Sequence, residues 1–167
     1  MVKMRPYISL TFAFSLLFTT LQANEHYLLP EQKSDLLQTL KRKVERAHTL
    51  SVITTDLESP ILSRSIERLL KKKYQFTLIT SSSSSAAYYA KYINTKVYLP
   101  PSQRPLEDFN INIFIIDKSD ICISSLAFNE QLLRQTQGIV SCTTAREEID
   151  FGLALIKKYQ QRFELYN

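Results

Sequence analysis

Five polar side chains recur at orderly intervals in one otherwise apolar stretch of this sequence, residues 109–128. They are Asn110, Asn112, Asp117, Ser124 and Ser125. Amide and hydroxyl groups donate hydrogen bonds to anions such as phosphate, but an asparagine amide has no basic lone pair with which to attack phosphorus. The stretch therefore supplies candidates for holding an anion and no nucleophile.

The same stretch is predicted to form a β-hairpin. Isoleucines alternate with other residues on both sides of a polar turn at 118–120, so residues 111–116 and 121–125 are expected to pair as antiparallel strands. An aspartate that ends a strand before a tight turn is commonly a turn former, so Asp117 has a structural explanation as well. The two serines likewise have a structural alternative to anion binding.

Strand and helix patterns alternate on either side of the hairpin, which predicts an α/β fold with a mixed β-sheet and helices on both faces. The helical patterns have apolar spacings of three and four residues, and Thr144 and Glu147 have the spacing of a capping box. Residues 129–137 read only as a polar segment. Strands are expected at 51–55, 76–80, 96–99 and 138–143, and helices over 30–48, from Ser59-Pro60, after the serine run 81–85, and from near Arg146.

This order of elements, together with residues 110–127, resembles the phospholipase D-like superfamily, and most closely its small secreted single-domain nuclease branch. The family motif is His-x-Lys, four residues, Asp, six residues, then Gly-Ser-x-Asn. The spacing is kept, with these residues in the motif positions: Asn110, Asn112, Asp117, Ser124, Ser125 and Ala127.

The resemblance implies a phosphodiesterase in which histidine attacks phosphorus, lysine neutralises the phosphate oxygens, and a second copy of the chain supplies the second histidine. Here asparagine stands in both the histidine and the lysine position, Ala127 replaces the motif asparagine, and Gly138 stands where the family has an acidic residue. We therefore assign no catalytic residue and expect a degenerate motif. An active phosphodiesterase of the same superfamily is the alternative.

No other histidine is placed to take over the missing role. The chain contains only His26 and His48, and neither precedes the hairpin strand. No cluster of metal-ligand residues stands out, and we expect neither a metal nor another cofactor.

The N-terminus has the pattern of an export signal. A basic start is followed by an uncharged apolar run from Tyr7 to Leu21 and by Ala23, which predicts a signal peptide at 1–23 and a phospholipase D-like domain at 24–167. The expected location is periplasmic or secreted, and the alternative is an inner-membrane anchor formed by the uncleaved segment.

Composition limits the remainder of the chain to one domain. Of the 167 residues, 44% are hydrophobic and two are glycine, enough for a single compact core. Removing residues 1–23 removes Lys3 and Arg5 and no acid, so the formal charge falls from +5 to +3. A mildly basic chain favours weak contact with phosphates or with an anionic membrane.

The two cysteines, Cys122 and Cys142, lie in separate strand-like runs. Each is a suitable buried free thiol, and an exported protein could also join them if the strands are neighbours. Sequence leaves both alternatives open.

Three kinds of function follow from these observations. The first is a binding module for nucleic acid or another phosphate-bearing ligand. The second is an active phosphodiesterase. The third is a partner protein that forms a homodimer, or a heterodimer with a relative whose motif is intact.

Overall fold

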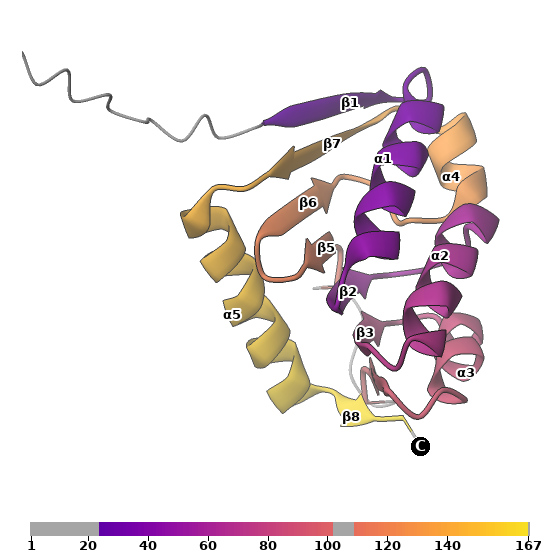
Figure 1. Cartoon of the computed structure of the whole chain (residues 1–167), viewed down its shortest axis with the longest axis vertical. Helices are drawn as coiled ribbons and strands as arrows, with labels where there is room; N and C mark the ends of the chain where they lie inside the picture. Colours follow the sequence, from indigo (N-terminus) through magenta and orange to yellow (C-terminus); the bar gives the residue numbers. More distant parts are fainter. Residues whose placement is uncertain (1–23, 102–108, 167) are drawn as a thin grey trace, which may run out of the picture.

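The computed structural model describes residues 24–101 and 109–166, so the expected signal peptide lies outside the described residues. Five helices and eight strands follow one another along this part of the chain (Figure 1). In order they are β1 (Glu25–Leu29), α1 (Lys33–Arg46), β2 (Thr49–Thr54), α2 (Pro60–Lys71), β3 (Gln75–Thr80), α3 (Ser83–Ala90), β4 (Thr95–Leu99), β5 (Asn112–Ile116), β6 (Asp120–Ser124), α4 (Glu130–Gln135), β7 (Gly138–Thr143), α5 (Arg146–Arg162) and β8 (Glu164–Leu165).

All eight strands join in one mixed sheet with the order β1-β7-β6-β5-β2-β3-β4-β8. The strands β2, β3 and β4 are parallel, as expected for strands joined through helices, and every other neighbouring pair is antiparallel. The parallel strands therefore end, and the hairpin of β5 and β6 opens, at the same end of the sheet. We call this the motif end, because the motif residues Asn112 and Ser124 lie there.

Helices cover both faces of the sheet, which confirms the predicted fold class. One core contains buried residues of α1, α2 and α3 together with Leu133 of α4. The other core lies beneath α5, where Ile149, Ile156 and Tyr159 pack on isoleucines of the central strands. Figure 1 shows α5 alone on its side of the sheet.

The predicted hairpin is confirmed. The strands β5 and β6 pair antiparallel, with Asn112 opposite Ser124 at the open end and Ile116 opposite Asp120 beside the turn. The last helix begins at Arg146 as expected, but the capping box is wrong. Ala145 occupies the N-cap position and has no capping side chain, while its N–H donates to the hydroxyl of Thr143 at 3.0 Å.

The polar segment 129–137 contains a helix that the sequence analysis did not predict. Asn129 caps α4 by accepting hydrogen bonds from the N–H groups of Gln131 and Leu132. The short edge strands β1 and β8 were also not predicted.

Cys122 and Cys142 form a disulfide, which decides between the two alternatives left open by the sequence. The residues lie directly opposite each other on β6 and β7, with a Cα–Cα distance of 4.0 Å. The bond links two strands of the sheet across a loop that contains α4.

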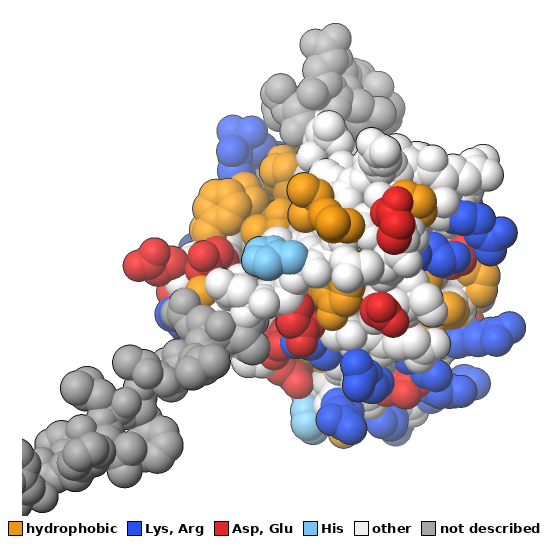
Figure 2. All heavy atoms as spheres, turned by 90° about the horizontal axis from the view of Figure 1, so that it is seen from above, with side chains coloured by type: hydrophobic (Ala, Val, Ile, Leu, Met, Phe, Trp, Pro, Cys, Tyr) orange, Lys and Arg blue, Asp and Glu red, His pale blue; other side chains and the backbone are white. Residues whose placement is uncertain are grey.

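No helix among the described residues is both long and apolar enough to cross a membrane. Charges are distributed unevenly over the surface. In the view of Figure 2, Lys and Arg side chains gather in the lower and right-hand parts, whereas hydrophobic side chains form a patch in the upper part.

Candidate functional site

The hairpin brings four of the five motif residues together and separates the fifth from them. Asn112 and Ser124 are register partners at the motif end, and Asn110 and Ser125 lie just outside them. Asp117 begins the turn at the other end of β5. Five strand residues at about 3.3 Å each place it roughly 16 Å away.

Asp117 holds the hairpin turn against the start of β2. Its backbone has a positive φ of 50°, and its Oδ1 accepts hydrogen bonds of 2.8 Å from the N–H groups of both His48 and Thr49. These bonds satisfy backbone donors at the start of the strand. The structure therefore gives Asp117 a structural role in the turn.

Asn112 is buried, with only 2% of its surface exposed. Its Oδ1 accepts hydrogen bonds from the Thr54 hydroxyl at 2.8 Å and from the Thr55 N–H at 3.3 Å. The amide thus ties the hairpin to the end of β2. A buried polar group held in this way is costly to replace by a charged one.

The two serines hold the strand exit. The hydroxyl of Ser124 accepts from the Leu126 N–H at 3.1 Å, and that of Ser125 accepts from the Ile139 N–H at 3.0 Å. A hydroxyl that accepts one bond keeps a hydrogen to donate. Ser125 is exposed and Ser124 is buried, so Ser125 is the one that meets solvent.

Gly138 is closely packed against this exit. A Cβ atom there would lie 2.7 Å from Cγ of Leu126 and 2.9 Å from the hydroxyl oxygen of Ser125. Any larger side chain at position 138 would require these neighbours to move.

A pocket of about 700 Å³ is connected to the motif end by hydrogen bonds. Thr54, which donates to Asn112, also contacts the carbonyl oxygen of Asp56. The carboxylate of Asp56 in turn accepts from Ser85 at 2.9 Å and from the Asn129 amide at 2.7 Å, and both of these residues line the pocket.

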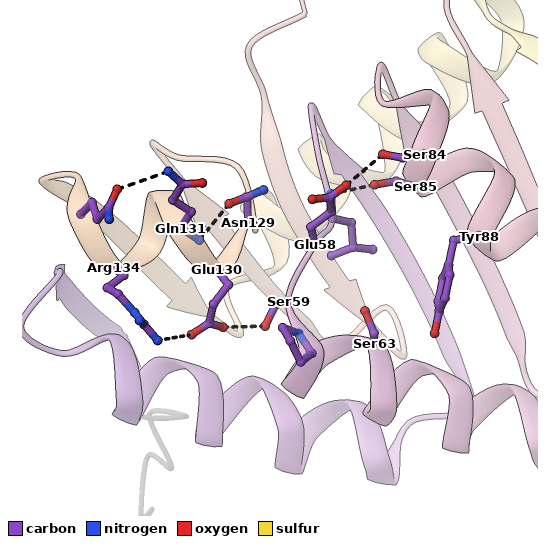
Figure 3. Close-up of a pocket in the computed structure, with 13 residues that line it drawn as sticks. Glu58, Ser59, Ser63, Ser84, Ser85, Tyr88, Asn129, Glu130, Gln131 and Arg134 are labelled. Atoms are coloured by element: carbon purple, nitrogen blue, oxygen red, sulfur yellow. Dashed lines mark hydrogen bonds and ion pairs between the residues drawn. The ribbon is translucent and has the colours of Figure 1, made fainter.

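The pocket lies where the N-termini of α2, α3 and α4 converge (Figure 3). Sequence analysis did not identify this site, because its walls come from three segments far apart in the chain. The serine run was its one visible sign: Ser82 caps α3, as expected from an N-cap serine, while Ser84 and Ser85 turn toward carboxylates.

Comparison with known proteins identifies the fold. No family model matches the chain, and no curated protein sequence matches it. NucT from Helicobacter pylori superposes with a TM-score of 0.77 at 18% identity, covering 87% of this chain and 99% of that one. Nuc from Salmonella typhimurium, a phospholipase D family member, gives a TM-score of 0.69 at 10% identity with the same coverages. The chain has a phospholipase D-like fold.

The likeness confirms the resemblance expected from the motif spacing and from the order of elements. NucT and Nuc are matched over almost their whole length, as expected for single-domain proteins of this fold. TrmBL2, an archaeal chromatin protein, is also similar, with a TM-score of 0.60 at 12% identity over 90% of this chain and 57% of that one.

In this phospholipase D-like fold, neither histidine reaches the motif end. His26 lies on the edge strand β1, with its Nδ1 3.0 Å from the hydroxyl of Ser141. His48 lies at the other end of the sheet, beside Asp117. Asn110 is exposed in the position where the family motif has histidine.

The pocket supplies negative charge at the helix N-termini from its own residues. Glu58 accepts from Ser84 at 2.9 Å, and Glu130 accepts from Ser59 at 3.2 Å (Figure 3). The positive ends of helix dipoles favour anions, and these carboxylates occupy that role already. A phosphate would therefore meet like charge here.

Cations near the pocket are committed to Glu130. Lys33 lies 2.6 Å from its Oε1 and Arg134 lies 3.8 Å from the same atom. The hydrogen bond from Lys33 is the main cause that lowers the pKa of Glu130 below 4.5, so this carboxylate stays charged at neutral pH. The pocket suits neutral or cationic groups better than phosphate.

Tyr88 closes one wall of the pocket. Its hydroxyl donates to Glu67, which raises the pKa of Tyr88 to about 12. The phenol is therefore protonated at neutral pH and offers no base. Among the residues that the structure describes, no group of three or more His, Cys, Asp or Glu side chains could hold a metal ion.

Proposed function

We propose that this chain is an exported phospholipase D-like protein that acts by binding and does not hydrolyse phosphodiesters. The observation that carries the proposal is the buried amide of Asn112 in the lysine position, bonded to Thr54 and Thr55. A site for phosphodiester chemistry needs a cation there to neutralise phosphate oxygens. Asn110 adds that the nucleophile position holds no histidine.

The tight packing of Gly138 supports the same proposal. The acidic residue of the family pattern has no room at this position unless Leu126 and Ser125 move. The departures from the motif are therefore built into the packing around the hairpin, beyond the loss of two exposed side chains.

Export is supported by two independent features. Residues 1–23 have the basic, apolar and small-residue order of a signal peptide. Cys122 and Cys142 form a disulfide, a bond that persists in oxidising compartments and is rare in the bacterial cytosol. Retention of the segment as a membrane anchor is the alternative.

The charge at the motif end favours a protein partner as the ligand. The neighbouring pocket is lined by Glu58 and Glu130, and its one cation, Arg134, pairs with Glu130. A second copy of the chain, or a relative with an intact motif, would meet neutral donors at Asn110 and Ser125.

Nucleic acid is the second candidate ligand. TrmBL2, which shares the fold, is described as having a novel mode of DNA binding. The basic side chains visible in Figure 2 are the feature of this chain that would support it, because non-specific nucleic-acid affinity rests on neutralising phosphates.

Hydrolysis assays test the main proposal. The exported chain should cleave neither DNA, RNA nor phosphatidylcholine above a buffer control, since loss of an activated nucleophile costs on the order of 10⁶ in rate in a well-studied serine protease. Clear hydrolysis that survives both His26→Ala and His48→Ala would overturn the proposal and require a different mechanism.

A repair experiment shows how deeply the site has changed. Asn110→His is tested alone and together with Asn112→Lys, with thermal unfolding measured for each variant. Recovered hydrolysis in the double variant would show that only these two side chains were lost. A folded but silent double variant implicates Ala127 and Gly138 as well. Co-purification with a histidine-bearing relative tests the partner role.

A further inference from the structure

A groove of about 580 Å³ runs between the C-terminal halves of α1 and α2 and is lined mostly by cations. Its residues are Glu45, Arg46, Arg68, Lys71 and Lys72. We refer to it as the basic groove. It lies on the helical layer of α1 to α4 and includes none of the motif residues.

The single acid of the basic groove is already neutralised. Glu45 pairs with Arg68 at 2.5 Å, and Lys72 donates to the carbonyl oxygen of Glu45 at 3.1 Å. Arg46 and Lys71 are exposed and have no acidic partner among the described residues. These two cations are the ones available to an external anion.

The charge around the basic groove exceeds that of the whole domain. Residues 41–46 and 64–73 contain nine Lys and Arg and two Glu, a formal charge of +7. The chain after residue 23 carries +3, so its remaining residues carry −4. The two helix C-termini offset only about one charge in total, roughly −0.5 each. The concentration of Lys and Arg in Figure 2 is therefore a real asymmetry of the molecule.

The basic groove and the N-terminal junction lie at the same end of the sheet. The helices α1 and α2 end just before β2 and β3 begin, opposite the motif end. The chain enters β1 at Glu25, which pairs with Cys142, and leaves it at Leu29, which pairs with Gly138 at the motif end. Residue 24 thus joins the domain at the end where the basic groove lies, and α1 packs against β1.

We propose that the basic groove docks the domain on a membrane surface that contains anionic lipid. The complementarity is electrostatic, since clusters of Lys and Arg are attracted to anionic headgroups. The N-terminal sequence favours a membrane over nucleic acid as the occupant: the apolar run 7–21 has to engage a membrane, and it joins the domain at this end. Cleavage after residue 23 leaves a positively charged α-amino group at the same end.

This docking fixes the orientation of the site. With the basic groove on the lipid surface, the motif end and its pocket point away from the membrane, toward a partner in the aqueous compartment. The inference does not depend on whether the motif is silent.

Vesicle binding by the chain as isolated from its host tests the proposal. Binding is measured to vesicles of phosphatidylcholine with and without phosphatidylglycerol, for the wild type, for Arg46→Gln/Lys71→Gln, and for Lys157→Gln/Lys158→Gln. The last variant is the matched control, because it removes the same charge from exposed positions of α5 on the opposite face.

Each cation near an anionic surface contributes about fivefold to binding, so the groove variant should bind phosphatidylglycerol vesicles roughly 25-fold more weakly. The control should change by less than about twofold, and wild-type binding should fall as salt is raised. An equal loss in both variants would contradict the proposal, and so would equal binding to vesicles with and without phosphatidylglycerol. Binding of an oligonucleotide through Arg46 and Lys71 without binding to vesicles would replace it with a nucleic-acid surface.

Discussion

Reduction of the Cys122–Cys142 disulfide should remove a large part of the stability of the domain. The bond closes a loop with a sequence separation of 20 residues. The chain-entropy estimate for a loop of about 20 residues is about 3 kcal/mol at 25 °C. The free energy of unfolding of a single domain is typically about 5–15 kcal/mol, so this loss is a substantial fraction.

Urea unfolding with and without a reductant measures the effect. With an m-value of about 2 kcal/mol per molar urea, a loss of about 3 kcal/mol lowers the unfolding midpoint by roughly 1.5 M. Cys122→Ala/Cys142→Ala is the control, because the reductant should not shift its midpoint. An unchanged midpoint for the reduced wild type would refute the reasoning, and would mean that pairing of β6 and β7 alone restricts the unfolded chain as much as the bond does.

Two further changes test the packing and the charges at the motif end. Gly138→Ala should lower the free energy of unfolding by about 1–3 kcal/mol because its new Cβ overlaps Leu126, and Leu126→Ala in the same chain should recover part of the loss in urea unfolding; a neutral Gly138→Ala would show that the exit is loosely packed. Lys33→Met should cost about 1 kcal/mol at neutral pH. Glu130 has a lowered pKa, so its contribution is present above about pH 4.5 and is lost as the pH falls through the folded-state pKa. The stability difference between wild type and Lys33→Met should therefore vanish in acid, whereas a difference that persists there would point to lost side-chain packing instead.

The sequence predicts well where apolar periodicity and buried structure coincide. The strands β5 and β6 consist largely of buried isoleucines, and α5 places an apolar stripe over them, so both patterns were legible. The helix α4 was not legible because only Leu133 of its six residues is buried, and its ends are held by Asn129 and by the contact of Glu130 with Lys33. The strand β8 has two exposed residues and no periodicity to detect.

The candidate site shows the same limit. The register of the hairpin follows from its alternation, and this alone predicts that Asn112 faces Ser124. The burial of the Asn112 amide against Thr54 does not follow, because the two residues are 58 positions apart. The pocket is even less accessible to sequence analysis, since its carboxylates matter only through helix ends that meet in the folded chain.

The pairing of β1 with β7 has a consequence for folding as the chain is made. Glu25–Leu29 emerges first, yet its only partner strand is Gly138–Thr143, more than one hundred residues later. Contacts of such long sequence separation form late and slow the folding of the whole domain. The first strand therefore has an unpaired backbone during most of synthesis, so the sheet cannot be completed until nearly the whole chain is available. A chain that delays its final sheet pairing in this way remains open to a holding chaperone for longer than one whose terminal strands pair locally.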